Sequence, residues 1–569
     1  MDDRDIIRIA IKNALEHGGK ANEGAVLSKV LGSDKEMLKD LVLTKKKIFK
    51  LVKEVNAKNL DDLQEDADEL GVELNQRPKT QRLGLKDLPN VTAPVVLRLP
   101  PEPSGYMHLG HAIAGMINFL YKQKYNGKLW LRFEDTNPRL VKKEFVSKFE
   151  EGYKWLGIQW DNKKFITPDI DKIYSFGEKL LKENKAYVCT CPADKIKKGR
   201  LDGIECQCRE RDIKENLGLF EDAKTGKIPE KKAIVRFKGN MKDRNLSLRD
   251  PNLFRIIDSD YDFPWLNRTE KIKLWPIYDF ANVIEDELCG VTHVLRSNEF
   301  KSEFQDVLRS ALGFKNLNVV QFSRFNFEGT PFSKRKIRGL IKDGLIKDWN
   351  DLRLPTITAI RRRGIQPTAI QEFVLSVGYS DSHHEYSWDL LFTLNRRIID
   401  RTAKRFFFVS EPARLIVQDA GERVAKLPLH PSEDMGFRTI KTNGEFFIDI
   451  KDFSAMKTGD IIRLKDLYTI EITDKDSETA KAKIISIDML GEEKIIQWVT
   501  DKNIRVTITN VGALLNKDGV FNADSLKIVN GLAENAIATL SKGDIIQFER
   551  FGFCILDDKE KHSFVYVSK

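Results

Sequence analysis

Apolar residues recur near the start of the chain with the spacing of amphipathic helices. One helical face carries four of them: Ile7, Ile11, Ala14 and Leu15. Shorter stretches of the same kind follow, whereas residues 75–94 contain three prolines and little periodicity. We therefore predict a helical extension and a linker over residues 1–85. The simplest interpretation is a small bundle without chemistry, and docking to RNA or to a protein is the alternative.

From residue 95 the pattern alternates between strand and helix. VVLRL (95–99) and KLWLRFED (128–135) are typical of buried strands, and residues 108–125 and 142–157 have helical spacing. Strand–helix–strand order predicts a doubly wound parallel sheet. Ligands bind beyond the carboxyl ends of such strands. We expect four side chains to gather there: His108, His111, Glu134 and Asp135.

Residues 186–275 interrupt this alternation with cysteines, short strands and polar loops, so we predict an insertion. A multidomain α/β fold results, with a Rossmann-type domain in two halves, residues 86–185 and 276–345. Helical patterns occupy residues 346–404. From 405 to 569, alternating runs lie between turn signals such as KTGD and SKGD, which predicts one or two antiparallel β-barrels.

Composition narrows the class of protein. The chain has 569 residues and a net charge of +10, with 41% hydrophobic and 32% charged residues, which is compatible with a polyanionic partner. It shows no signal peptide and no apolar run long enough to span a bilayer. Six cysteines in a chain this long favour the reducing cytoplasm. Walker A and dinucleotide-binding fingerprints are missing from the sequence.

PPEPSGYMHLGH (100–111) is a strand-to-helix turn with two histidines in the first helical turn. Backbone N–H groups at a helix start have no intrahelical partner, so the turn suits an anion such as phosphate. Three interpretations compete for His108 and His111. They could bind a metal, although a third ligand at matching spacing is missing; they could be structural; or they could donate hydrogen bonds to phosphate charge in a transition state.

FEGTPFSKRKIR (327–338) predicts a basic loop. Alone it could be an ordinary solvated surface. Together with the proline-rich turn it gains a role, because Ser333 and Lys334 could close over a triphosphate held at the helix start.

Three motifs carry a family resemblance. RLPPEPSGYMHLGH (98–111) resembles the HIGH motif of class I aminoacyl-tRNA synthetases, and PFSKR the KMSKS loop, with Pro331 in place of its first lysine. LRFEDTNP (131–138) is similar to glutamyl- and glutaminyl-tRNA synthetases. The resemblance runs from about residue 94 onward. It implies a class I Rossmann-type catalytic domain, an inserted acceptor-stem-binding domain at 186–275, a helical connecting domain and anticodon-binding β-barrels.

The same resemblance implies ATP with Mg²⁺, tRNA as partner, and a set of site residues. The implied catalytic residues are His108, His111 and Lys334. The implied ATP-binding residues are Pro103, His108, Gly110, His111, Ser333 and Lys334. The implied amino-acid pocket consists of Arg98, Glu134, Tyr278, Asn282 and Arg296.

Arg296 favours glutamate over glutamine as the substrate. Relatives specific for glutamate keep an arginine at this place, and a guanidinium matches a carboxylate. The helical extension and the C-terminal barrels are similar to the archaeal and eukaryotic glutamyl branch. A glutamine–tRNA ligase, a tRNA-free relative and a non-catalytic tRNA-binding paralogue are the alternatives. The resemblance implies tRNA(Glu) as substrate and leaves tRNA(Gln) open; we expect a monomer.

Four cysteines form two CxC pairs fourteen residues apart: Cys189, Cys191, Cys206 and Cys208. Four thiolates suit a tetrahedral structural zinc site. The alternative is four ordinary reduced thiols. Relatives often have a zinc knuckle at this place.

Overall fold

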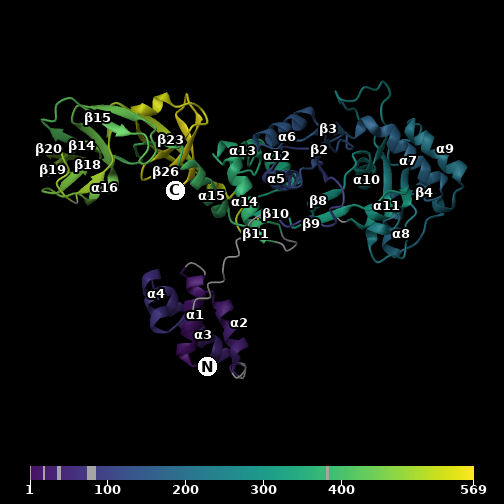
Figure 1. Cartoon of the computed structure of the whole chain (residues 1–569), viewed down its shortest axis with the longest axis horizontal. Coiled ribbons are helices and arrows are strands. Elements are labelled where there is room, and N and C mark those ends of the chain that lie inside the picture. Colours follow the sequence, from purple (N-terminus) through teal and green to yellow (C-terminus); the bar gives the residue numbers. More distant parts are fainter. Residues whose placement is uncertain are drawn as a thin grey trace. The chain divides into compact units, whose positions relative to one another are not determined.

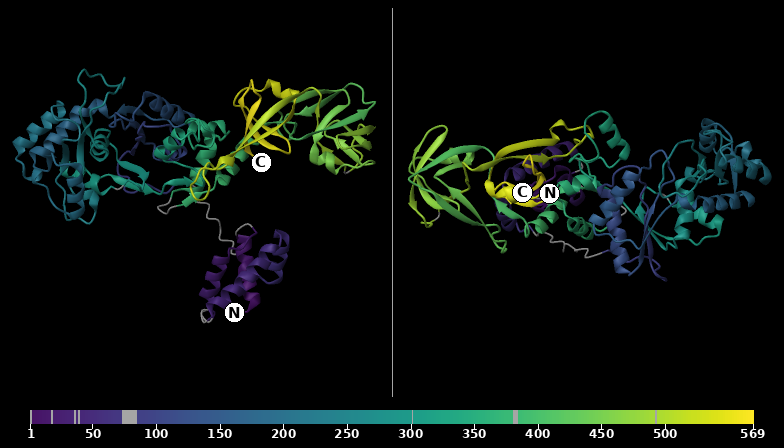
Figure 2. Two further views of the ribbon diagram at one scale, coloured as in Figure 1. Left: turned by 180° about the vertical axis from the view of Figure 1, so that it is seen from behind. Right: turned by 90° about the horizontal axis from the view of Figure 1, so that it is seen from above.

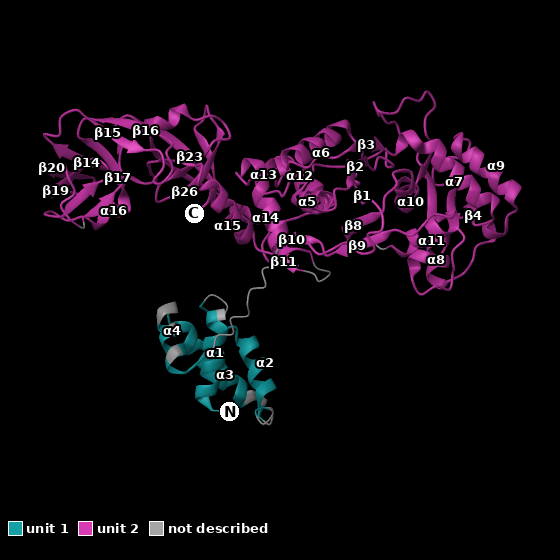
Figure 3. Ribbon diagram, viewed as in Figure 1, with its two compact units in different colours: residues 1–83 teal, residues 84–569 magenta. Residues whose placement is uncertain are grey.

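A computed structural model of the chain describes residues 2–16, 19–34, 37, 40–72, 85–300, 302–379, 384–491 and 493–569. It separates into two compact units, residues 1–83 and 84–569 (Figure 3). Much of the predicted linker, residues 75–84, lies outside the described residues. Within the described part, every helix is too short or too polar to cross a membrane.

The first unit is a small helical bundle, as predicted (Figure 1). Its helices are α1 (Asp3–Glu16), α2 (Glu23–Ser33), α3 (Leu41–Ala57) and α4 (Leu60–Glu69). Helix α1 contacts all three others. Ile11 and Ala14 are fully buried in the shared core. The side chains of Asn22 and Asp40 cap α2 and α3 by accepting backbone N–H groups, which fixes where these helices begin.

The second unit begins with the predicted parallel sheet. Its strands β1 (Val96–Leu99), β2 (Lys128–Phe133) and β3 (Asn162–Phe165) pair in that order, all parallel. A second parallel pair, β8 (His293–Ser297) and β9 (Asn318–Phe322), adjoins β1 through the Thr292 N–H, which donates to the Val96 carbonyl at 3.0 Å. The order is therefore β3-β2-β1-β8-β9, with β1 central.

Helices connect and cover these strands. Helix α5 (Leu109–Lys124) links β1 to β2 and contacts β1, β2 and β8. Gly115 lets it pack closely, because an added Cβ would lie 2.7 Å from the Tyr153 ring of α6 (Lys143–Trp155). Three further helices belong to the same region: α7 (Ile170–Lys182), α10 (Tyr278–Leu288) and α11 (Glu303–Leu312). The doubly wound fold is confirmed.

Between α7 and α10 the chain forms a separate antiparallel sheet. Its strands are β4 (Ala186–Cys189), β5 (Ile234–Phe237), β6 (Asn252–Ile256) and β7 (Leu274–Pro276), in sequence order. Helices α8 (Ala193–Asp202) and α9 (Ile213–Lys224) join β4 to β5. This sheet occupies the segment in which we predict an insertion.

The segment after β9 is mainly helical. It contains β10 (Phe325–Phe327), α12 (Lys334–Lys342), α13 (Ile357–Arg362), α14 (Pro367–Val377), β11 (His384–Tyr386) and α15 (Trp388–Ile399). The strand β11 departs from the helical pattern expected over 346–404. It forms because it pairs in parallel with β10, a contact between residues far apart in the sequence.

Two seven-stranded sheets follow from Lys404 onward (Figure 2). One sheet consists of β12 (Lys404–Phe406), β25 (Ile545–Phe548), β26 (Gly552–Asp558), β27 (Ser563–Ser568), β23 (Asn503–Val511), β24 (Leu526–Glu534) and β13 (Phe408–Val409). The other consists of β21 (Lys494–Ile496), β18 (Ile461–Leu464), β19 (Tyr468–Lys475), β20 (Thr479–Ser486), β14 (Pro412–Gln418), β17 (Glu445–Asp449) and β22 (Val499–Thr500). The hairpin β15 (Arg423–Pro428)–β16 (Phe437–Thr442) and helix α16 (Ile450–Ala455) complete this region.

Both sheets curl until their ends meet. The end strands β12 and β13 are separated only by Phe407, and β21 and β22 only by Gln497 and Trp498. Most pairs are antiparallel, as expected, but each sheet also contains two parallel pairs, such as β12 with β25 and β14 with β20. Local alternation cannot reveal these parallel pairs, because they join distant segments.

Candidate functional site

A cavity of about 620 Å³ opens where β1, β2 and β8 end. Eight of the predicted site residues line it: Arg98, His108, Gly110, His111, Glu134, Tyr278, Arg296 and Lys334. The other three, Pro103, Ser333 and Asn282, are not lining residues, but each lies in the same turn, loop or helix as residues that are. Three motifs, the first and the last more than 200 residues apart in the sequence, therefore meet in one cavity.

The two histidines stand at the start of α5. The backbone N–H of His108 donates to His111 Nδ1 at 3.2 Å, and the imidazole centroids lie 3.7 Å apart. Because His111 Nδ1 accepts this bond, its ring proton is on Nε2. Burial lowers the pKa of His108 to about 3 and that of His111 well below its usual value. Both rings are therefore neutral near pH 7 and can each donate one hydrogen bond.

Lys334 opens α12 and reaches across to the proline-rich turn. Its Nζ donates to the Glu102 carbonyl and to Ser104 Oγ, each at 3.0 Å. Ser333 caps the same helix by accepting from the Lys336 N–H. Gly105 makes room for the lysine, since an added Cβ would lie 3.2 Å from Lys334 Cδ. Burial lowers the pKa of Lys334 to about 8.

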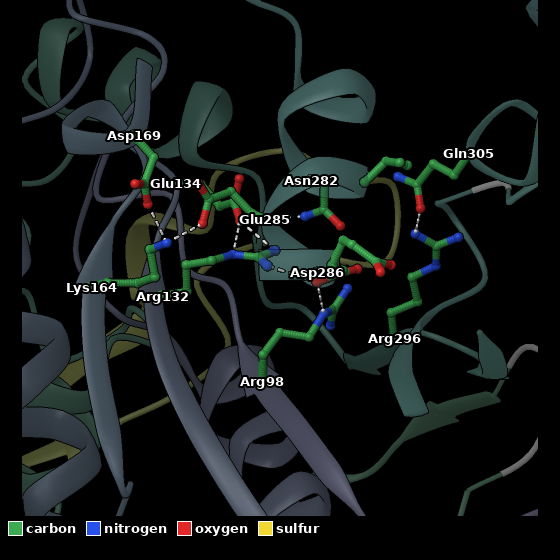
Figure 4. A network of polar contacts seen from close by, with 12 residues as sticks. Arg98, Arg132, Glu134, Lys164, Asp169, Asn282, Glu285, Asp286, Arg296 and Gln305 are labelled. Atoms are coloured by element: carbon green, nitrogen blue, oxygen red, sulfur yellow. Dashed lines mark hydrogen bonds and ion pairs between the residues drawn. The ribbon is translucent and has the colours of Figure 1, made fainter. Parts of the chain in front are cut away.

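A buried network of charges forms one wall of the cavity, which Arg98 and Glu134 line (Figure 4). Arg132 donates to Asp286 Oδ1 at 2.7 Å and to Glu134 Oε1 at 3.0 Å. Arg98 donates through Nε to the same Asp286 oxygen at 3.2 Å. Asn282, in the amide orientation that satisfies both its groups, bonds Asp286 and Arg132. Behind this group, Lys164 pairs with Glu285 at 2.7 Å and also contacts Asp169.

Several charged atoms in this wall have no partner among the described residues. They are Nη1 and Nη2 of Arg98, Nε and Nη2 of Arg296, and Oε2 of Glu134. Arg296 is only 6% exposed, and its Nη1 donates to Gln305 Oε1 at 2.7 Å. Gln305 is itself anchored, because its amide nitrogen donates to Asp279 at 2.9 Å. Arg296 is therefore a buried arginine held by an uncharged side chain, and not part of a surface ion pair.

Burial shifts the pKa values of two side chains that line the cavity, Glu134 and Tyr278. It raises the pKa of Glu134 to about 7, and Arg132 only partly offsets this effect. Burial likewise raises the pKa of Tyr278 to about 12. Tyr278 packs beside Phe300, with ring centroids 5.6 Å apart. The cavity thus combines buried cationic donors, one buried carboxylate and aromatic surface.

Asp135 is not a cavity residue, contrary to the expectation from its place in the motif. Its carboxylate accepts the backbone N–H groups of Ile166 and Thr167, each at 3.0 Å, and the Trp265 indole N–H at 2.7 Å. Successive side chains of an extended segment point to opposite sides, so Glu134 faces the cavity and Asp135 faces away. Asp135 fastens the end of β2 to the segment after β3.

Sequence reasoning missed three members of the site: Arg132, Asp286 and Gln305. Two of them carried a signal. Arg132 precedes Glu134 by two residues and so shares its side of the strand, and Asp286 follows Asn282 by four residues and so shares its side of α10. Gln305, on α11, has no such relation to a predicted site residue.

Comparisons with known proteins agree with this geometry. Residues 94–401 match the family model described as tRNA synthetases class I (E and Q), catalytic domain. Residues 403–489 and 495–557 match two anticodon-binding domain models of the same class. The chain belongs to the class I glutamyl/glutaminyl-tRNA synthetase family.

Curated relatives of this synthetase match it along its whole length. A glutamate–tRNA ligase from Nitrosopumilus maritimus is 36% identical over 99% of both chains. Those from Pyrococcus furiosus and Methanocaldococcus jannaschii are 35% and 34% identical, each over at least 98% of both chains. The predicted family is confirmed, and class I membership implies ATP as a substrate.

The inserted segment of the synthetase carries the four cysteines, at the end of β4 and in the connection that follows it. The Sγ atoms of Cys189 and Cys206 lie 3.7 Å apart, as do those of Cys191 and Cys208, and all four lie within 4.8 Å of one another. Zinc–sulfur bonds of about 2.3 Å at tetrahedral angles place the sulfurs about 3.8 Å apart. The four thiols therefore fit one zinc ion.

Proposed function

We propose that this synthetase is a glutamate–tRNA ligase, which activates L-glutamate with ATP and transfers the glutamyl group to the 3′ end of tRNA(Glu). One observation carries the choice of amino acid: the unpartnered guanidinium nitrogens of Arg98 and Arg296 face one cavity that also holds the unpartnered oxygen of Glu134. The names of the curated relatives support the same choice.

The charges of the cavity match those of glutamate. Arg296 is assigned to the γ-carboxylate, and Glu134 to the ammonium group. Arg98, Tyr278 and Asn282 complete the pocket. A buried guanidinium that loses its acceptor costs about 3–5 kcal/mol. The neutral amide of glutamine cannot supply the missing charge, so this pocket disfavours glutamine, and the rival glutamine–tRNA ligase with it.

The histidines and Lys334 are assigned to the phosphates of ATP. In the first step a substrate carboxylate oxygen attacks the α-phosphorus and pyrophosphate leaves, so catalysis requires positioning and charge stabilisation. His108 and His111 can donate to the pentavalent phosphorus, and Lys334 can exchange Ser104 and Glu102 for phosphate oxygens. Pro103, Gly110 and Ser333 hold the backbone of the binding turn and loop. Mg²⁺ accompanies ATP, bound mainly by phosphate oxygens.

Aminoacylation with labelled amino acids tests the proposal. Glutamate and glutamine are each offered with tRNA(Glu) and tRNA(Gln) transcripts, in the presence of ATP and Mg²⁺. We expect glutamate on tRNA(Glu). Glutamate on both transcripts would mark a ligase that does not discriminate between them. Glutamine on either transcript would overturn the pocket assignment, and failure to charge any tRNA would favour a non-catalytic tRNA-binding protein.

The use of glutamate is expected to fall on the acid side of neutrality. Glu134 binds the ammonium only when it is ionised, and its pKa is raised to about 7. Below that pH, kcat/KM for glutamate should drop about tenfold per pH unit, because this ratio reports the free enzyme. The profile is measured with wild type and with Glu134→Gln. If kcat/KM falls below pH 7 in the variant just as it does in the wild type, a group other than Glu134 causes the fall.

We also propose that Cys189, Cys191, Cys206 and Cys208 bind a structural zinc ion. The purified chain should contain about one zinc per molecule, measured by mass spectrometry of the metal. Cys206→Ser should lose most of it and lower the melting temperature of the second unit. Cys289→Ser, at a buried cysteine outside the cluster, is the matched control and should keep its zinc. Wild-type protein without zinc after expression in zinc-supplemented medium would contradict the assignment.

A further inference from the structure

Arg363 is a buried cation without an ion-pair partner among the described residues, and it does not line the catalytic cavity. It follows α13 directly and is only 7% exposed. Its guanidinium lies 4.8 Å from the Trp388 ring centroid and 5.2 Å from that of Phe392. Among the described residues it donates no side-chain hydrogen bond and forms no ion pair. Its pKa is lowered to about 10 by burial alone.

This arginine forms the floor of a separate cavity of about 390 Å³. Helix α15 supplies one wall, with Asp389, Phe392, Thr393 and Arg396, and strands β23 and β27 supply the other, with residues 510–511 and 566–569. Ser568 contributes a buried hydroxyl without a partner. Arg396 and Lys569 are exposed at the rim.

The charges around Arg363 leave it uncompensated. Asp389 is the acidic side chain among the lining residues, but it is exposed and is not within ion-pair distance of Arg363. Nη1 of Arg396 donates a hydrogen bond to the backbone oxygen of Lys569 at 3.2 Å. Aromatic faces stabilise a cation less than burial destabilises it, so an anion that enters the cavity would stabilise Arg363. Among the described residues, no acidic side chain forms an ion pair with Arg363.

The cavity is held in shape by the contacts around it. Arg362, next to Arg363, forms a two-pronged ion pair with Asp557 at 2.9 and 2.7 Å. Gly364, with a φ of +73°, packs against β27, and an added Cβ would lie 2.8 Å from Val567. Ile399 and Val567 share a buried cluster across the same boundary. The cavity is therefore a defined feature of the joint between α13–α15 and the C-terminal sheet.

We propose that this cavity binds a phosphate group of the tRNA backbone, held by Arg363 on its floor and by Arg396 and Lys569 at its rim. The inference rests on the proposed function. A guanidinium fork matches phosphate oxygens, and the Ser568 hydroxyl can donate to them. The position favours tRNA over free phosphate. The cavity lies at the boundary between residues matched by the catalytic model (94–401) and by the anticodon-binding models (from 403), which a tRNA bound to both must cross.

The test replaces Arg363 by glutamine in the full chain. Affinity for tRNA(Glu) is measured by filter binding over a range of KCl concentrations, and steady-state kinetics are measured alongside. We expect the tRNA Kd to rise about tenfold at 0.1 M KCl. Loss of one phosphate contact should also lower the slope of log Kd against log salt by about 0.7–0.9. The KM values for ATP and glutamate should not change, which separates this result from a failure of the proposed function.

Arg361→Gln is the matched control. Arg361 lies in the last turn of α13, two residues before Arg363, and also stands over an aromatic ring, Trp155 at 5.6 Å, but it is exposed and outside the cavity. It should shift the tRNA Kd less than twofold. An unchanged Kd and salt slope in Arg363→Gln would overturn the proposal. If Arg363→Gln does not fold, the rim double variant Arg396→Gln/Lys569→Gln carries the test, with an expected threefold rise in Kd, and no rise would overturn it.

Inorganic phosphate distinguishes the two sources of the anion. Without tRNA, 10 mM phosphate should leave the melting temperature of wild type and Arg363→Gln equally unchanged. Stabilisation of the wild type alone, together with unchanged tRNA binding in the variant, would assign the cavity to free phosphate and overturn the tRNA assignment.

Discussion

Replacing Arg296 by glutamine is expected to lower kcat/KM for glutamate about 1000-fold, or about 4 kcal/mol in transition-state free energy. The γ-carboxylate would then enter a buried pocket without its matching cation. Arg296 is held in place by Gln305, so the variant removes the charge and leaves the pocket wall otherwise intact. The measurement is steady-state aminoacylation with glutamate varied at saturating ATP and tRNA.

The specificity of this effect is checked in two ways. The KM for ATP should not change, because Arg296 is assigned to the γ-carboxylate of glutamate and not to the phosphates of ATP. Arg309→Gln removes a second buried arginine of the same region, which pairs with Glu287 at 2.7 Å outside the cavity. That control should lower stability without changing the glutamate KM. Unaltered glutamate kinetics in Arg296→Gln would remove this residue from the pocket.

Lys334→Ala is expected to slow formation of the adenylate about 100-fold while tRNA affinity stays within twofold. The lysine charge matters most when negative charge develops on the leaving pyrophosphate, and removing one such donor typically costs 10²–10³ in rate. Single-turnover aminoacylation at saturating tRNA measures the step. Filter binding measures the affinity.

Lys336→Ala is the control for Lys334. It removes the same charge two residues further along α12, where Nζ donates to the Gly519 carbonyl at 3.1 Å. Its rate should stay near that of the wild type. Equal losses of rate and of tRNA affinity in Lys334→Ala would indicate that the lysine serves to hold the loop or the tRNA instead.

The sequence predicts the elements around the site well, because local patterns determine them. Strand β1, the proline-rich turn and α5 follow from apolar runs and helix-start signals, and these place His108 and His111 correctly. What it cannot predict are contacts between distant segments. The bonds from Lys334 to Glu102 and Ser104 join residues more than 200 positions apart, and no periodicity records them.

The charge network shows the same limit on what the sequence can predict. The sequence predicts Glu134 as a pocket residue, and its side chain lines the cavity, but Asp135, one residue on, faces the opposite way. Arg132 and Asp286 determine how Glu134 and Arg98 are held, but their spacing from Glu134 and Asn282 in the sequence indicates only which side of the strand or helix they share. Their role depends on their being buried together, which a one-dimensional pattern of charges does not show.

The interleaving of the two curled sheets has a consequence for synthesis on the ribosome. Every strand of the sheet that contains β14 lies between residues 412 and 500, whereas the sheet that contains β12 combines residues 404–409 with 503–568. The inner stretch can therefore complete its hydrogen bonding while the last strands are still being made. Strand β12 can form its hydrogen bonds with β25 only after residues 545–548 have been synthesised. We expect nascent chains halted after residue 500 to protect β14–β22 from protease and to leave β12 and β13 open to cleavage.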